Sequence, residues 1–123
     1  MELAETGLIV EVIPRNGYCQ VVARGEVDLT VSPLLAARLA VAADGGPPRL
    51  VVDLHDVGFL DCSGVNALLR AMRAAEERGG FLYVGAVHPR VRRVLELAGV
   101  EKALSDTEAV RAAWPAAPFL LDG

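Results

Sequence analysis

One stretch of the chain constrains its fold more than any other: within residues 58–65, a buried strand pattern gives way to an amphipathic helix pattern. Before it, residues 50–54 form a short apolar run rich in β-branched side chains, typical of a central strand covered on both faces. After it, four apolar residues recur at the helical period and would form one stripe: Val65, Leu68, Leu69 and Met72. The pattern predicts a strand followed directly by a helix that ends near Arg78.

This junction places the hydroxyl of Ser63 at or beside the first turn of the helix. Two interpretations of Ser63 are open at this point. It is either part of a plain helix N-cap, since Ser and Asp are common caps and residues 61–63 straddle the boundary, or a phosphorylation site. A phosphate would suit this position because N–H groups of a first helical turn lack intrahelical partners and the helix dipole favours negative charge.

The N-terminal part predicts an antiparallel pair of strands, residues 8–13 and 18–24. Between them Asn16-Gly17 is a strong hairpin signal, because both residue types tolerate positive φ. Residues 81–87 predict a further strand. Since parallel strands need a crossover helix, residues 50–87 have the length of a βαβ unit.

Three more helix starts are marked by capping residues or prolines: Ser32 as N-cap with Pro33, His88 with Pro89, and Asp106 or Thr107. They predict helices that end near Ala43, at Gly99 and near Trp114. We expect residues 103–104 to form a short extended piece. The apolar residues 119–121 are expected to pack on the body of the protein or on a neighbour.

Composition excludes several classes of function. Apolar residues make up 53% of the chain and aromatic residues only 5%, so the core is expected to consist mostly of Val, Leu and Ala. With 12 basic and 16 acidic residues the net charge is -4, and the concentrated basic face that nucleic-acid binding needs is absent. No apolar stretch reaches the roughly 18 residues of a membrane span, and no signal-peptide pattern opens the chain. We therefore expect a cytoplasmic protein with no membrane or nucleic-acid partner.

The two cysteines, Cys19 and Cys62, form neither a metal-ligand spacing nor a disulfide framework, and both are expected to be reduced. No metal or cofactor is expected. A redox role for Cys62 stays open, since a helix N-terminus lowers the pKa of a thiol and the neighbouring Asp61 opposes that effect.

An enzyme would need Cys62 or Ser63 as a nucleophile at the strand-to-helix turn. The Gly-x-Ser-x-Gly pattern is absent, and the only bases of the usual type are His55 and His88. His55 ends the central strand and His88 precedes a proline at a helix start, where turn and surface roles are commoner. We expect no catalytic residue and no enzymatic activity.

The order of the predicted elements, together with Gly25-Glu26-Val27-Asp28 and Phe59-Leu60-Asp61-Cys62-Ser63-Gly64, resembles the STAS family of bacterial anti-sigma-factor antagonists. A D-[ST]-[ST]-G motif after a hydrophobic strand is fairly specific for this family when a G-E-x-D segment precedes it. The similarity covers about residues 8–113. It implies an α/β fold: one STAS-like domain over residues 1–123, with residues 115–123 as a tail. Its small mixed sheet would combine an antiparallel hairpin with a parallel βαβ unit, flanked by about four helices.

The resemblance also implies transcription regulation by partner switching. The unphosphorylated antagonist would bind an anti-sigma factor that is itself a serine kinase, and so free the sigma factor. Phosphorylation of the residue that matches Ser63 would release the kinase, and a serine phosphatase would restore the active form. The residues implied in partner binding are Asp28, Asp61, Cys62, Ser63 and Gly64. Cys62 is a departure, because the family usually has Ser or Thr at that position.

A second hypothesis keeps the family and changes the role. The chain would then be a STAS module that is not phosphorylated and acts as a scaffold or ligand-binding subunit of a transport or stress-response assembly. Members that lost the switch often lose the serine, whereas this chain keeps it. The sequence leaves open which kinase and sigma factor are involved, and the oligomeric state.

Overall fold

The computed structural model describes residues 7–120. Within that range four strands form one mixed sheet in the order β1-β2-β3-β4. The strands are β1 (Leu8–Pro14), β2 (Cys19–Val27), β3 (Arg49–Leu60) and β4 (Phe81–Val87). β1 pairs with β2 in antiparallel fashion, while β3 is parallel to both β2 and β4. The predicted combination of a hairpin and a parallel βαβ unit is confirmed.

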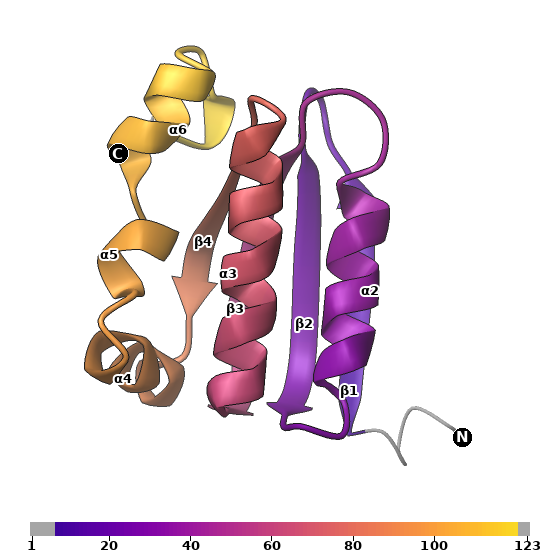
Figure 1. The fold of residues 1–123 in the computed structure, drawn as a ribbon, viewed down its shortest axis with the longest axis vertical. Helices are drawn as coiled ribbons and strands as arrows, with labels where there is room; N and C mark the ends of the chain where they lie inside the picture. Colours follow the sequence, from indigo (N-terminus) through magenta and orange to yellow (C-terminus); the bar gives the residue numbers. More distant parts are fainter. Residues whose placement is uncertain (1–6, 121–123) are drawn as a thin grey trace.

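Two helices link the parallel strands and lie side by side on one face of the sheet (Figure 1). They are α2 (Ser32–Ala42) and α3 (Cys62–Glu77). Beyond β4 the chain continues through three short helices, which follow one another along the β4 edge of the sheet (Figure 1). These are α4 (Pro89–Leu97), α5 (Glu101–Leu104) and α6 (Thr107–Ala113), and a 3-10 turn, Pro118–Leu120, follows them.

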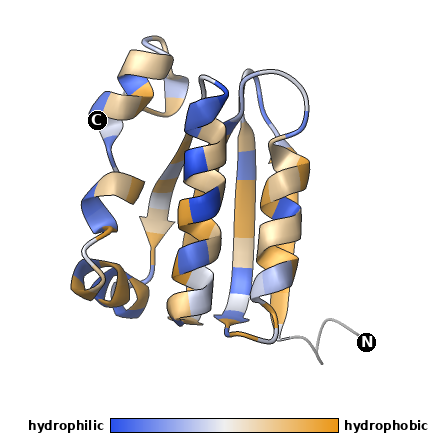
Figure 2. Cartoon of the chain, viewed as in Figure 1, coloured by the Kyte–Doolittle hydropathy of each residue, from blue (hydrophilic) through white to orange (hydrophobic). Residues whose placement is uncertain are grey.

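The main core lies between the sheet and the two covering helices. The buried side chains from α2 and α3 are Leu35, Leu39, Ala42, Val65, Leu68 and Met72. They meet the alternate residues Leu50, Val52 and Leu54 of β3, all fully buried. Each of these Leu, Val and Met side chains contributes about 1.5–3 kcal/mol by leaving water. Most of the outward surface of α3 is hydrophilic in Figure 2, as expected for an amphipathic helix.

A second, smaller core covers part of the opposite face of the sheet. Successive side chains of a strand point to opposite faces, so Val51 and Tyr83 face away from α2 and α3. They join a cluster with Phe81, Trp114 and Phe119. In that cluster Tyr18 and Phe119 have ring centroids 5.1 Å apart, and the Arg49 guanidinium lies 4.3 Å from the Trp114 ring. The expectation that the tail packs on the body is confirmed for residues 119–120, whereas Leu121 lies outside the described residues.

Two strands are longer than predicted. β2 continues through Gly25-Glu26-Val27, and β3 continues for six residues beyond Leu54. Pairs such as Gly25 with Val57 and Val27 with Leu60 hold the two extensions together, with register shifts on the way. The polar residues at 55–56 and Gly58 break the apolar alternation and make this part resemble a loop. Pairing to β2 overrides that local signal, so His55 lies within the strand and not at its end.

The predicted N-cap of α2 is wrong. The cap position is Val31, which makes no side-chain cap, and Ser32 is the first helical residue. The turn begins earlier, at Asp28, whose carbonyl accepts the Ser32 N–H at 2.8 Å. The Asp28 carboxylate also accepts the Thr30 N–H at 3.0 Å. Because Asp28 already organises the entry, the Ser32 side chain is buried instead.

Residues 103–104 are not extended but form the end of α5. The Leu104 N–H donates to the Val100 carbonyl at 3.1 Å, and the Leu104 side chain is fully buried. A helix of this length shows no periodicity in the sequence.

The other two predicted helix starts are confirmed, since the side chains of His88 and Asp106 cap α4 and α6. In the β1–β2 turn only Gly17 has positive φ, and Asn16 does not.

Candidate functional site

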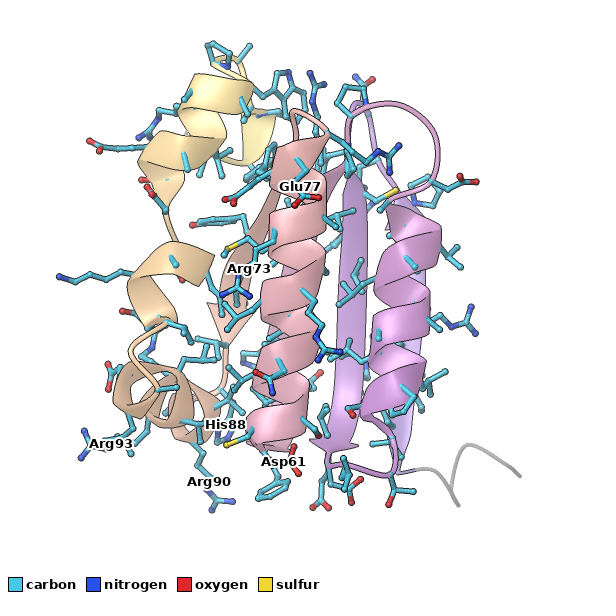
Figure 3. The ribbon with its side chains drawn as sticks, viewed as in Figure 1. Asp61, Arg73, Glu77, His88, Arg90 and Arg93 are labelled. Carbon is cyan, nitrogen blue, oxygen red and sulfur yellow. The ribbon has the colours of Figure 1, made fainter. Side chains whose placement is uncertain are left out.

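The carboxyl ends of three parallel strands lie at one edge of the sheet, and each leads to a helix through a polar residue. Asp28 follows β2, Asp61 follows β3 and His88 follows β4. The Asp61 N–H donates to the Val27 carbonyl at 3.1 Å, which joins the first two of these junctions. Figure 3 shows Asp61 and His88 at this same end of the molecule. The topology thus gathers residues that are far apart in the sequence.

Asp61 is the N-cap of α3. One of its carboxylate oxygens, Oδ1, accepts the backbone N–H of Ser63 at 2.9 Å and that of Gly64 at 3.3 Å. The same oxygen accepts the Ser63 hydroxyl at 2.5 Å. The interpretation of Ser63 as the cap is therefore wrong: Ser63 is the second residue of the helix, and Asp61 caps it.

These hydrogen bonds lower the pKa of Asp61 below its ordinary value. The largest cause is the hydrogen bond from the Ser63 hydroxyl; partial burial opposes it, and the backbone N–H groups of Gly64, Ser63 and Leu29 add to the lowering. Each bond stabilises the charged form of the carboxylate. Because the backbone N–H of Leu29 is among these donors, the lowered pKa also reflects contact between Asp61 and the loop after β2.

The partly buried Ser63 has its hydroxyl directed to a carboxylate. The sequence predicts unoccupied N–H donors beside it, but Asp61 already occupies those of Ser63 and Gly64. A phosphate on Ser63 would therefore displace its hydrogen bond to Asp61 and set roughly two negative charges against a third. Its main effect would be felt at the surface, as added charge next to the cap.

Gly64 is buried where α3 crosses the ends of the strands. A Cβ atom there would lie 2.8 Å from Val27 Cγ1 and closer still to Leu60 Cδ1. Glycine thus allows the first turn of α3 to approach the sheet closely, which fixes Ser63 against the ends of β2 and β3.

Asp28 lies in the loop after β2 and is exposed. Its Oδ1 accepts the N–H groups of Thr30 at 3.0 Å and Val31 at 3.2 Å. The carboxylate therefore holds the loop in shape, and both predicted acids combine turn or cap chemistry with a place at the same edge.

Comparison with known proteins places this arrangement in a family. The model of the STAS domain family matches residues 8–112. The chain belongs to the STAS domain family. Among curated proteins it is similar to the anti-sigma-B factor antagonist of Staphylococcus aureus strain NCTC 8325 / PS 47. The two are 24% identical over 94 residues, which is 76% of this chain and 87% of that protein. The anti-sigma-B factor antagonist of Staphylococcus epidermidis matches to the same extent.

Solved structures agree with this assignment. An anti-sigma factor antagonist from Mycobacterium paratuberculosis superposes with a TM-score of 0.72 at 28% identity, covering 88% of this chain and 95% of that one. The anti-sigma factor antagonist SpoIIAA in its unphosphorylated form gives a TM-score of 0.65 at 24% identity, covering 85% and 95%, and supports the fold. The mixed sheet with its flanking helices is the STAS fold.

Three residues of the STAS domain that sequence reasoning missed are large apolar side chains near this edge or beside α3. Leu29 is 76% exposed, Phe59 49% and Leu97 72%. Leu29 and Phe59 are each close in sequence to a predicted acid, Asp28 and Asp61. The sequence gives no alternation signal for Phe59, because the polar residues at 55–56 and Gly58 interrupt the apolar pattern. Leu97 gives no signal either, because its position beside α3 depends on the tertiary fold.

Cys62 is the first residue of α3 and is exposed. It lines an apolar groove between α3 and α4 that also contains Leu69, Val94 and Leu97. The redox hypothesis for Cys62 stays a prediction, which iodoacetamide alkylation of the native protein tests: an unmodified Cys62 would end it.

Neither histidine is arranged as a base for a nucleophile. The His55 Nδ1 lies 3.0 Å from the Asp56 carboxylate, and His88 Nδ1 accepts the Arg90 N–H at 3.1 Å. The Ser63 hydroxyl donates to Asp61 instead. Among residues 7–120, no three His, Cys, Asp or Glu side chains are grouped to hold a metal ion, and no helix there is long and apolar enough to cross a membrane.

Proposed function

We propose that this STAS domain is an anti-sigma-factor antagonist that acts by partner switching and is controlled at Ser63. In its unphosphorylated form it binds an anti-sigma factor that is a serine kinase, and so frees the sigma factor. The kinase phosphorylates Ser63, which releases the antagonist, and a serine phosphatase reverses the change. The protein acts in the cytoplasm as a binding protein and not as an enzyme.

One observation carries this proposal: Ser63 lies in the first turn of α3 with its hydroxyl donated to Asp61, at a junction that also carries exposed apolar side chains. Leu29 and Phe59 give a partner apolar surface near Ser63, and Cys62 gives an exposed neighbour on the helix. The junctions after β2 and β3 are shaped by Asp28, Asp61 and Gly64. A phosphate introduced here adds about 1.5–2 negative charges to a contact surface without any need to unfold the domain.

The effect of one phosphate on the affinity for the partner is large enough for a switch. Placing an unpaired charge in an interface costs about 2–5 kcal/mol, and each 1.4 kcal/mol changes affinity tenfold. A single phosphate at Ser63 thus reduces affinity by more than an order of magnitude. Similarity to anti-sigma factor antagonists supports the same role for this chain.

Intact mass after incubation with ATP and each candidate anti-sigma kinase of the same genome tests the proposal. We expect one added phosphate on the wild type, none on Ser63→Ala, and unchanged phosphorylation of Thr30→Ala, a matched hydroxyl control at the junction after β2. Kinase binding should fall with phosphorylation. No phosphate with any kinase, or phosphate that persists on Ser63→Ala, would favour the scaffold hypothesis instead.

A further inference from the structure

The groove between α3 and α4 is the largest apolar feature beside the candidate site. It has a volume of about 450 Å³ and is lined by Cys62 and Leu69 from α3, Val94 and Leu97 from α4, and Val100 beyond α4. The groove on the other side of α3 is smaller, about 260 Å³, and is lined mostly by alanines. The α3–α4 groove therefore offers the larger apolar volume to a side chain of another molecule.

Leu97 makes the groove an unusual surface. Its side chain is 72% exposed, while its groove neighbours Leu69 and Val94 are half-buried. Full burial of a leucine is worth about 1.5–3 kcal/mol, so this exposure leaves a driving force for association unused. A grooved apolar patch rimmed by charge is typical of an interaction site.

Two arginines lie beyond the ends of the groove. Arg73 lies four residues after Leu69 and extends the same stripe of α3, and Figure 3 shows it projecting toward α5. Arg90 lies four residues before Val94 and seven before Leu97 on α4, at the end near Asp61 (Figure 3). Within the part of the chain that the structure describes, neither arginine forms an ion pair.

No acidic or basic residue lines the groove itself. Beyond its ends, Glu77 lies one turn after Arg73 and forms no ion pair within residues 7–120, and Asp61, next to Cys62, accepts backbone N–H groups of α3. On α4, Glu96 lies 4.0 Å from Arg93, and Glu101 beyond α4 lies 3.5 Å from Arg92. An apolar groove with an unpaired arginine toward each end is complementary to an apolar surface flanked by carboxylates.

We propose that the α3–α4 groove binds an acidic amphipathic helix of a partner protein. The apolar stripe of that helix would cover Leu97 and the groove, and its acidic residues would pair with Arg73 and Arg90. Along α3 the stretch from Cys62 to Arg73 spans eleven steps of 1.5 Å, about 16 Å, so roughly three turns of a partner helix fit it.

The groove begins at Cys62, the residue next to Ser63. Ser63 itself lines the groove on the other side of α3, so a phosphate on it would lie beside the Cys62 end of the α3–α4 groove and not within it. Its negative charge repels an acidic occupant, which gives phosphorylation the direction of release. The identity of the partner as the anti-sigma factor rests on the function proposed above, whereas the preference for an acidic helix does not.

Calorimetry with each candidate anti-sigma factor of the same genome tests the partner. We expect Leu97→Asp to weaken binding at least about tenfold, since an anchor would be lost and like charges introduced. Val41→Asp, a matched change at an apolar residue of α2 that is 59% exposed, should leave affinity within about twofold. Wild-type affinity of Leu97→Asp, combined with lost binding of Ser63→Asp, would overturn the groove proposal and leave the switch intact.

A second arm needs no anti-sigma factor. Amide shifts of the full chain are followed while a synthetic peptide of about 15 residues is added, with leucines at helical spacing and glutamates at both ends. We expect saturable shifts at Cys62, Val94 and Leu97, and at least about fivefold weaker binding by Arg73→Glu/Arg90→Glu. Equal binding of the peptide with lysines in place of the glutamates, or no shifts at the groove, would overturn the proposal. So would a dimer of this chain that Leu97→Asp abolishes, because the occupant would then be a second copy.

Discussion

The junctions after β2 and β3 both use an aspartate to accept backbone N–H groups between a strand and a helix, and they differ in one respect. At each, an aspartate follows the strand and its carboxylate accepts two backbone N–H groups. Asp61 lies directly before the first residue of α3, whereas three residues separate Asp28 from α2. Ser32 also lies in the first turn of α2, but of the two serines only Ser63 has a hydroxyl that donates to the aspartate of its junction. Spacing, and not the acid itself, distinguishes the candidate site.

The largest effect should come from negative charge at the two junctions. Ser63→Asp should weaken binding of the unphosphorylated antagonist to its anti-sigma factor by about 30-fold or more, because a charge enters the contact surface beside Asp61. Thr30→Asp adds the same charge to the exposed loop after β2 and should change affinity by less than about threefold. Calorimetry at constant ionic strength measures both. Equal losses would remove the distinction between the junctions.

The next effect concerns the close approach of α3 to the sheet. Gly64→Ala should lower the free energy of unfolding by about 1–3 kcal/mol, because the added Cβ meets the side chains of Val27 and Leu60. Gly58→Ala is the matched control, since nothing lies within 4 Å of a Cβ there, and it should change stability by less than about 0.5 kcal/mol. Urea unfolding followed by circular dichroism measures both variants. A neutral Gly64→Ala would mean that the first turn of α3 has room to move.

Removal of the carboxylates of Asp61 and Asp28 should have a smaller effect on the free energy of unfolding. Asp61→Ala should cost about 1 kcal/mol, the usual value for loss of a helix N-cap, whereas Asp28→Ala should cost less because that carboxylate is exposed and holds a turn. The same urea titrations compare them. The opposite order would show that the loop after β2 matters more to the fold than the cap of α3.

The contribution of Asp61 should also depend on pH. Its pKa is lowered in the folded protein, so the stabilisation is fully present above the ordinary value near 3.8 and is lost as pH falls through the folded value. The difference in unfolding free energy between wild type and Asp61→Asn should be constant from about pH 7 to 5 and shrink below about pH 4. A difference that does not change with pH would mean that charge plays no part in the cap.

The smallest effect is expected at the departure from the family motif. Cys62→Ser restores a hydroxyl at an exposed position and should change stability by less than about 0.5 kcal/mol. The initial rate of phosphorylation by the kinase is the more informative measurement. A rate that rises more than about tenfold would show that the kinase reads the side chain at this position, and an unchanged rate would assign Cys62 to the groove alone.

Local patterns explain which parts of the fold were predictable. The stripe of Val65, Leu68 and Met72 and the run at 50–54 carry the two periodicities in the sequence itself, so both elements were found. The extension of β3 past Leu54 was not, because residues 55–60 depend on pairing with β2. At the site, Asp61 and Ser63 were found from their motif, while their hydrogen bond and the true cap required coordinates.

The sequence by itself determined where the strand-to-helix junction lies and which residues meet there, because capping and amphipathic periodicity act over a few residues. Tertiary structure alone decided that Leu29 and Phe59 stay exposed near the same edge, and that Leu97 borders a groove beside Cys62. Burial of a side chain depends on which other elements pack against it, and α4 packs against β3, which lies far earlier in the chain. Nothing in the local pattern of α4 specifies that strand or the position of α3 beside the groove.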